Sequence, residues 1–386
     1  MRTSASTSPA RIWARLPLGL LGMLALIAAI EPLIALRATS WTRFYIYDWR
    51  VTSRAATRAA VDADVLFLGD SLVKFSLAPL EFERRTGLRA YNLALCGGQA
   101  TSSYYLLRRA LAAGARPRAV VVDFAPYLLA EGPRHNAREW PEMIALGEFL
   151  DLAWKTRHAA FCGRLALAAL VPSIKDRDEI RAAVLEAATG ARAQTLDRAD
   201  ELAAIARNWV VNRGALLCPR RESYDGSINA TSKTYFPARF APDPVEEADA
   251  RRLLDLASRH NVRVFWLLTP TTPRFQERLD ALGLTRGHDD WLRRIERDWP
   301  SLTVIDARRG GFAHDDFIDP LHLNVDGARA LTDAVADLVP QADGDVAPTR
   351  GWLAARRPSG DAGPSRLEDF ERTRLGLHEA TERRAR

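Results

Sequence analysis

The chain is expected to be organised around the stretch VLFLGDS, residues 65–71. Four apolar residues end in Gly-Asp-Ser, and a short apolar run that stops at a turn signal is typical of a buried strand in a parallel sheet. Ligands of such sheets bind just past the carboxyl ends of the strands, so Ser71 is predicted to lie at a binding edge. Asp70 and Ser71 are also common helix N-caps, and a strand, a turn and a cap without chemistry would explain the same residues.

A second candidate stretch, DPLHLN, lies far downstream at residues 319–324. Apolar residues at helical spacing after residue 326 predict that a helix follows it. Asp319 and His322 are three positions apart, so both side chains can project from one turn. A serine hydroxyl becomes a good nucleophile when a base takes its proton, and the base needs a third group that orients its ring. An ordinary loop before a capped helix is the alternative for this segment.

Together these segments resemble the SGNH, or GDSL-type, hydrolase superfamily over residues 62–339. That family has a serine in Gly-Asp-Ser near the start of its domain and Asp-x-x-His near the end. The segment YNLALCGG, residues 91–98, is similar to the family's second block. The resemblance implies a three-layer, flavodoxin-like α/β fold with about five parallel strands. It also implies a catalytic triad of Ser71, Asp319 and His322, with an oxyanion hole formed by the backbone N–H groups of Ser71 and Gly97.

The chain departs from the family pattern after the expected third strand. The family commonly has Gly-x-Asn-Asp there, with the asparagine as another oxyanion donor, whereas this chain has VVVDFAPY at residues 120–127. The divergence resembles a membrane-tethered branch that includes proteins of teichoic acid D-alanyl transfer and of polysaccharide O-acetylation. Asp70 and Asn92 are predicted to support the site, with Asn92 bracing its loop.

The resemblance implies acyl transfer through an acyl-serine intermediate, in which His322 takes the Ser71 proton and Asp319 orients the ring. Water or a sugar hydroxyl would accept the acyl group. The expected protein is an extracytoplasmic esterase or O-acyltransferase that acts on an acylated envelope polysaccharide or another ester, with a membrane acyl-donor protein as a further candidate partner. The alternative is a catalytically silent SGNH-like domain that binds or scaffolds exported polysaccharide. No cofactor and no metal site are predicted.

The first residues of the chain favour a membrane anchor. Residues 1–15 carry three arginines, and residues 16–36 are apolar apart from the interruption by Glu31 and Pro32. This segment has the roughly 20 residues that spanning needs, although it also fits the apolar region of a signal peptide. We expect an uncleaved transmembrane helix, with the arginines keeping the N-terminus cytoplasmic and the catalytic domain outside. Aromatic residues in the connection at 37–61 fit either an interfacial belt or packing against the domain.

The remaining segments alternate between predicted strands and helices, which is typical of a parallel, helix-covered sheet. The strands are expected at 64–68, 89–93, 119–124, 262–268 and 302–306. Residues 131–243 break this rhythm and are predicted to form a helical cap beside the active site, with helices at 146–170, 178–188 and 198–211. Helices lying on a membrane surface are the alternative for this insertion. Residues 340–386 are expected to form a flexible tail with one candidate helix at 366–382.

Composition excludes few classes of function. The net charge is +6, but the basic residues are scattered among acids, so a nucleic-acid partner is not indicated. The hydrophobic fraction of 47% suits a globular protein with a sizeable core. Of the three cysteines, Cys162 and Cys218 are a candidate disulfide pair in an oxidising compartment, and Cys96 is predicted to be buried.

Overall fold

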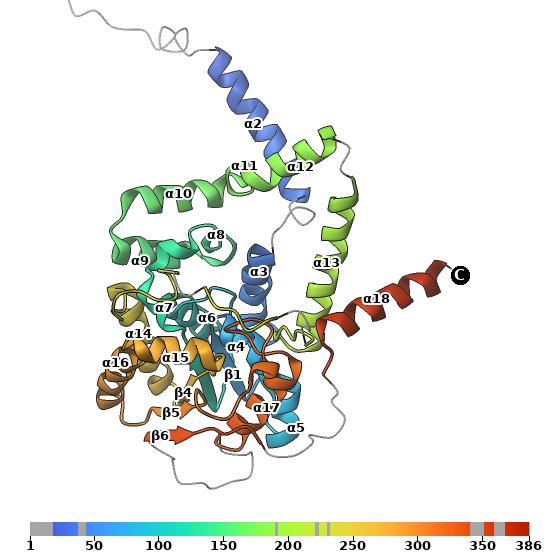
Figure 1. The fold of residues 1–386 in the computed structure, drawn as a ribbon. Coiled ribbons are helices and arrows are strands. Elements are labelled where there is room, and N and C mark those ends of the chain that lie inside the picture. The colour runs from blue at the N-terminus through green and yellow to red at the C-terminus, as the bar shows by residue number, and fades with distance from the viewer. Residues whose placement is uncertain are drawn as a thin grey trace, which may run out of the picture.

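The computed structural model describes residues 18–37, 44–189, 192–220, 224–229, 232–339, 351–358 and 367–385. Within them the chain forms a six-stranded, fully parallel sheet with the order β2-β1-β3-β4-β5-β6 (Figure 1). The strands are β1 (Val65–Gly69), β2 (Ala90–Asn92), β3 (Ala119–Asp123), β4 (Arg263–Leu268), β5 (Thr303–Asp306) and β6 (Gly351–Ala354). The α/β class and the parallel sheet are therefore confirmed, and the expected number of strands is one too low.

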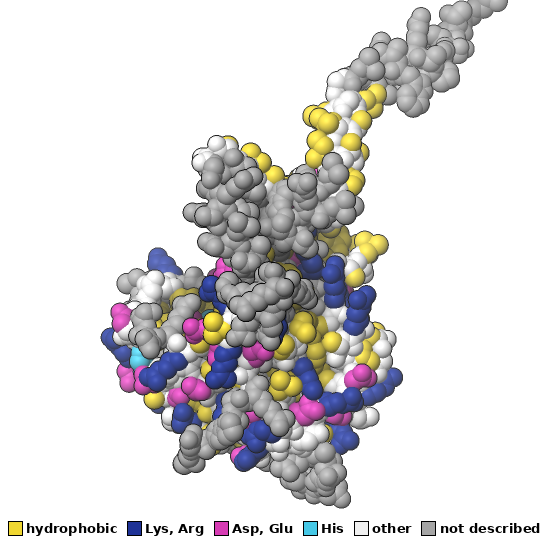
Figure 2. Space-filling model, turned by 90° about the vertical axis from the view of Figure 1, so that its right-hand side faces the viewer, with side chains coloured by type: hydrophobic (Ala, Val, Ile, Leu, Met, Phe, Trp, Pro, Cys, Tyr) yellow, Lys and Arg dark blue, Asp and Glu magenta, His cyan; other side chains and the backbone are white. Residues whose placement is uncertain are grey.

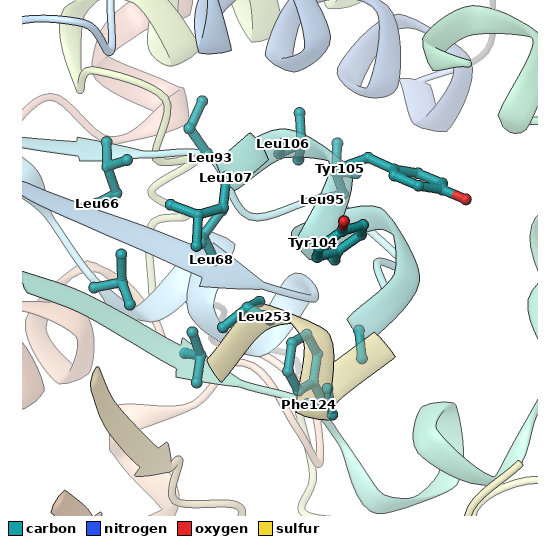
Figure 3. Close-up of a cluster of buried hydrophobic side chains, with 14 of the residues drawn as sticks. Leu66, Leu68, Leu93, Leu95, Tyr104, Tyr105, Leu106, Leu107, Phe124 and Leu253 are labelled. Atoms are coloured by element: carbon teal, nitrogen blue, oxygen red, sulfur yellow. The ribbon is translucent and has the colours of Figure 1, made fainter. Parts of the chain in front are cut away.

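Helices cover both faces of the sheet. Successive side chains of a strand point to opposite faces, so each strand contributes apolar side chains to a core on either side. On β1, Leu66 and Leu68 belong to one hydrophobic core, and Val65 and Phe67 belong to the other. The first core, which Figure 3 shows in part, also contains side chains from α3 (Phe44–Ala56), α6 (Ala100–Ala112), α14 (Pro244–Arg259) and α16 (Leu284–Asp298). The second contains side chains from α4 (Ser71–Ser76), α5 (Pro79–Thr86) and α17 (Val325–Ala336).

The strand order identifies one edge of the sheet as the place for a site. β1 lies between β2 and β3, so the chain winds away from β1 in opposite directions, and ligands of doubly wound sheets bind at such a switch point. In the β1–β3 register Gly69 pairs with Asp123, so the two strands end level with each other. The turns that begin at Asp70 and at Phe124 therefore lie side by side at the carboxyl edge.

The predicted transmembrane helix at residues 16–36 is not supported. Among the described residues, no helix is long and apolar enough to cross a membrane. α2 (Leu18–Arg37) contains Glu31 and Pro32, and the Glu31 carboxylate accepts a hydrogen bond of 2.9 Å from the backbone N–H of Ser173. Ser173 belongs to another helix, α11 (Pro172–Lys175), so a charged side chain engaged with the protein interrupts the apolar run. The N-terminus predicted to be cytoplasmic, residues 1–15, lies outside the described residues.

The segment predicted as a juxtamembrane connection contributes to the core through α3. Trp49 is fully buried, and its ring makes an edge-to-face contact with Trp140, at 5.1 Å between ring centroids. Trp140 begins α8 (Trp140–Met143), which belongs to the insertion. Of the two explanations left open for the aromatic residues of this segment, packing against the domain is the one that applies to Trp49.

Residues 131–243 form a mainly helical insertion in the described part of the chain. Besides α8 and α11, its helices are η2 (Pro133–Asn136), α9 (Leu146–Thr156), α10 (Ala159–Leu170), α12 (Arg177–Thr189) and α13 (Arg192–Val211). The helix expected over 146–170 is broken at Arg157, whose φ of 47° is left-handed. One face of α9 exposes Leu146, Leu150 and Trp154, which are spaced four residues apart. Such an apolar stripe is also what a helix on a membrane surface would present.

The segment expected to be a flexible tail contributes a strand and a helix. β6 pairs in parallel with β5, and α18 (Phe370–Ala385) packs beside α13. The side chain of Asn208 in α13 donates hydrogen bonds to Glu368 O (2.7 Å) and to Thr373 Oγ1 (3.1 Å). β6 has only four residues, which is too short for a periodic pattern to reveal it.

Candidate active site

Three polar side chains from distant segments meet at the carboxyl edge of β1. Ser71 is the first residue of α4, directly after β1, whereas Asp319 and His322 lie in the loop before α17. His322 Nε2 is 2.8 Å from Ser71 Oγ, and His322 Nδ1 is 2.7 Å from Asp319 Oδ2. The prediction that these three residues lie together is confirmed, and their chemical roles stay predictions.

The Asp319 carboxylate is held so that one oxygen faces the imidazole ring. Its Oδ1 accepts hydrogen bonds from the backbone N–H groups of Leu321 (2.8 Å) and His322 (2.9 Å), which leaves Oδ2 for the ring. Burial acts to raise the pKa of Asp319, but the hydrogen bonds and the charge of His322 outweigh it, so the pKa is lowered. An ionised carboxylate at Nδ1 favours the tautomer in which Nε2 is free to accept the proton of Ser71.

The ring of His322 is also positioned from its side. Phe75 lies one turn after Ser71 in α4, and its ring centroid is 4.9 Å from that of His322, with an angle of 55° between the planes. The contact with Phe75 and the hydrogen bond between Nδ1 and Asp319 together limit the orientations that the His322 ring can take. Ser71 itself is 8% exposed, so this residue is largely sheltered from water.

The predicted oxyanion donors lie on two turns that touch each other. The N–H of Leu95 donates to Gly69 O at 3.0 Å, which holds the loop after β2 against the end of β1. A Cβ at Gly98 would collide with the same carbonyl oxygen, and Gly97 has a left-handed φ of 71°, so this approach requires glycine. Within the described residues, the N–H groups of Ser71 and Gly97 donate to no protein acceptor. Both are therefore available to a developing oxyanion.

Asp70 connects the turns after β1 and β3. Its carboxylate accepts hydrogen bonds from the N–H groups of Leu72 (2.7 Å) and Ala125 (2.6 Å). Burial, and then the charge of the neighbouring Asp123, raise the pKa of Asp70. At the supporting position predicted for it, Asp70 is thus a structural link next to Ser71, made through hydrogen bonds to the backbone.

Asn92 braces the loop after β2, as predicted. Its Nδ2 donates to Val73 O and Leu77 O, both at 3.0 Å, and its Oδ1 accepts from Ala94 N at 3.0 Å. The side chain therefore joins the end of α4 to the loop that carries Gly97. The side chain is completely buried, which makes these three bonds necessary for its polar atoms.

The structure adds a group of residues that the sequence analysis missed. Asp48 Oδ2 accepts a hydrogen bond from the N–H of Cys96 at 2.8 Å, and Trp49 Nε1 donates to Cys96 O at 3.0 Å. Asp48 Oδ1 also forms a 2.8 Å ion pair with Lys74, which lies in α4 three residues after Ser71. These contacts hold both sides of the candidate oxyanion hole. The signal in the sequence was Asp48, an acidic residue among aromatic ones. It does not reveal the contacts with Lys74 and Cys96, which lie far away along the chain.

Asn136 lies beside Gly97, although the third-strand asparagine of the family pattern is missing. Its Nδ2 donates to Gly97 O at 2.8 Å and to Gln99 Oε1 at 2.7 Å. These bonds occupy the amide group in holding the loop, so Asn136 acts as a support there. Asn136 belongs to η2, which lies outside the three motifs at 65–71, 91–98 and 319–324. The sequence around it contains no signal for this role.

The cysteines do not form the candidate bridge. No disulfide joins Cys162 to Cys218, and Cys96 is buried as predicted. Burial raises the pKa of the Cys96 thiol well above its ordinary value, and the charge of Asp48 adds to this effect. Cys96 is therefore an inert neighbour of the site.

No protein-family model matches the sequence, and no curated protein matches it. The similarity to the SGNH superfamily consequently rests on the three motifs.

Proposed function

We propose that this protein is a serine acyl esterase or O-acyltransferase of the SGNH type. The observation that supports it best is the continuous hydrogen-bonded series Asp319–His322–Ser71 at the switch point of a parallel sheet. The alternative of a loop and a cap without chemistry does not require a histidine to connect a carboxylate to a buried serine hydroxyl. Two bonds of hydrogen-bond length in series are what an activated nucleophile needs.

In the proposed reaction, His322 Nε2 takes the proton of Ser71 while Oγ attacks the carbonyl carbon of an ester. The N–H groups of Ser71 and Gly97 would stabilise the negative charge that develops on the carbonyl oxygen. Collapse of this intermediate expels the alcohol, which takes the proton from His322, and leaves an acyl-serine. His322 then removes a proton from water or from a sugar hydroxyl, which attacks the acyl-serine. Ser71 Oγ leaves and takes that proton back from His322, which restores the starting state.

For the substrate, we propose an acylated polysaccharide of the cell envelope, with a membrane acyl-donor protein as a partner if the acceptor is a sugar. Tyr45 supports a sugar ligand, because its side chain is 51% exposed and lies close enough to Asp319 for that charge to contribute to its raised pKa. Burial is the main cause of that rise. A tyrosine with an exposed ring offers both an apolar face and a hydrogen-bonding tip.

Labelling with a fluorescent fluorophosphonate tests the nucleophile directly. The wild-type protein should be labelled and Ser71→Ala should not. Ser76→Ala is a matched control, because Ser76 is a buried serine of the same helix whose hydroxyl has no hydrogen-bond partner within the described part of the chain. Labelling that persists in Ser71→Ala, or that is absent from the wild type, would favour the rival function of a silent domain that binds exported polysaccharide.

We further propose that the protein works at the envelope in contact with a membrane surface. The exposed stripe of Leu146, Leu150 and Trp154 on α9 supports this, and Figure 2 shows that α2 also presents hydrophobic side chains to solvent. Co-sedimentation with anionic lipid vesicles should be weakened by Leu150→Glu. Equal sedimentation of the two proteins would remove the support that this stripe provides.

A further inference from the structure

A cavity lies beside the candidate triad at the carboxyl edge of the sheet. Its wall includes Leu72, which follows Ser71, and Leu321, which precedes His322. Tyr235 and Phe240 of the insertion line it as well. A second cavity adjoins the first, since the two share the lining residues Leu72, Pro126, Thr271, Leu279 and Leu284. An acyl group attached to Ser71 would therefore have apolar space next to it.

The second cavity contains polar atoms that have no partner. Thr271 lines both cavities and His288 lines the second one. Thr271 Oγ1 and His288 Nε2 are buried, and neither has a hydrogen-bond partner among the residues that the structure describes; His288 is only 2% exposed. Most buried polar atoms of proteins are hydrogen-bonded, so two unpaired atoms around one cavity indicate that it receives a polar group.

The groups around the second cavity favour a neutral ligand. Arg308 is already paired with Asp306 at 2.7 Å and with Asp289 at 2.8 Å, so its charge is satisfied. Burial, followed by the charge of Arg308, lowers the pKa of His288 to about 3, so its ring is neutral. A hydroxyl group and a neutral imidazole nitrogen are both suited to a neutral hydroxyl. A carboxylate would instead meet the buried side chain of Asp123, which also lines this cavity.

We propose that the two cavities bind the acyl part of the ester, and that this acyl group is a short chain carrying a hydroxyl, which bonds to Thr271 and His288. The inference rests on the proposed function and specifies its substrate. The cavities have volumes of about 30 and 40 Å³. A water molecule needs roughly 10–15 Å³, so the two cavities together have room for a short chain such as hydroxybutyryl.

The test uses the Ser71→Ala protein, which keeps the cavity walls but cannot form an acyl-serine. Isothermal titration calorimetry would compare ethyl 3-hydroxybutyrate with ethyl butyrate, which differ by one hydroxyl. The hydroxy ester should bind about tenfold more tightly, as expected for one or two hydrogen bonds to otherwise unpaired groups. Adding Thr271→Val, which has the same shape, should remove most of this preference. Adding Ser103→Ala should not, because it deletes a buried unpaired hydroxyl that is not a lining residue of either cavity.

Each outcome decides a different claim. Equal affinity for the two esters, no binding of either at millimolar concentration, or a preference that survives Thr271→Val would overturn the proposed hydroxyacyl site. Selective binding by Ser71→Ala, combined with a wild type that neither hydrolyses these esters nor reacts with fluorophosphonate, would reject the proposed enzyme and keep the binding site. Selective binding together with faster hydrolysis of the hydroxy ester by the wild type would support both.

Discussion

Breaking the buried ion pair between Lys74 and Asp48 should destabilise the fold and loosen the candidate oxyanion loop. Lys74 Nζ lies 2.8 Å from Asp48 Oδ1, and the two side chains are 0% and 1% exposed. Thr52 Oγ1 lies within hydrogen-bond distance of both groups. Because the other Asp48 oxygen holds the N–H of Cys96, this pair connects α3 and α4 to the residue before Gly97.

The magnitude follows from the burial of both charges. Lys74→Met leaves a carboxylate without its partner, and removing one member of a buried pair costs about 3–5 kcal/mol in the free energy of unfolding. Asp48→Asn leaves an unpaired ammonium and should cost a similar amount. The double variant buries no charge, and its asparagine carbonyl can still accept the Cys96 N–H. It should therefore cost less than either single change, with a coupling energy of at least about 2 kcal/mol.

Urea unfolding followed by tryptophan fluorescence measures these differences, since the chain has 10 tryptophans. Arg85→Met is the control, because the ion pair of Arg85 with Asp337 is 45% and 44% exposed and should be worth about 1 kcal/mol or less. If Lys74→Met costs no more than Arg85→Met, or if the two single losses at Lys74 and Asp48 simply add, the account of this pair is wrong.

Three further predictions concern the site and the core. Ser71→Ala should lose nearly as much ester turnover as replacement of all three triad residues, because the three act as a unit, and Asp319→Asn should lose somewhat less. A triple variant whose loss of turnover equals the product of the three single losses would contradict this. Burial raises the pKa of Glu246 from 4.5 to about 8, so its contribution to stability is complete below about pH 4.5 and is lost as the pH rises through 8. Urea unfolding across that range should show the loss in the wild type and little of it in Glu246→Gln, whose amide oxygen can still accept from Thr101. Gly98→Ala should lower the unfolding free energy by about 2 kcal/mol or more, since its methyl group would meet a backbone oxygen; a fully stable variant would show that the loop is placed differently.

The local features of this protein follow from residues that are close together along the chain. A continuous apolar run predicts β1, which is buried at every position from Val65 to Gly69. The Asp319–His322 contact was also predictable, because residues three positions apart in one turn can touch without help from the rest of the chain. Asn92 and Cys96 likewise lie where the motif and the apolar pattern indicated.

Contacts between groups that are far apart in the sequence depend on how the strands and helices pack. Ser71 and His322 are 251 positions apart, and nothing but the parallel order of the strands brings them to one edge. Hydrophobic periodicity shows which face of a segment is apolar, but it does not show what covers that face. For this reason the apolar run at 16–36 was wrongly predicted to span a membrane, the packing of Trp49 against the domain was left as one of two alternatives, and β6 was not predicted. The unpaired atoms of Thr271 and His288 were invisible for the same reason, because burial without a partner is a property of packed segments and not of a residue sequence.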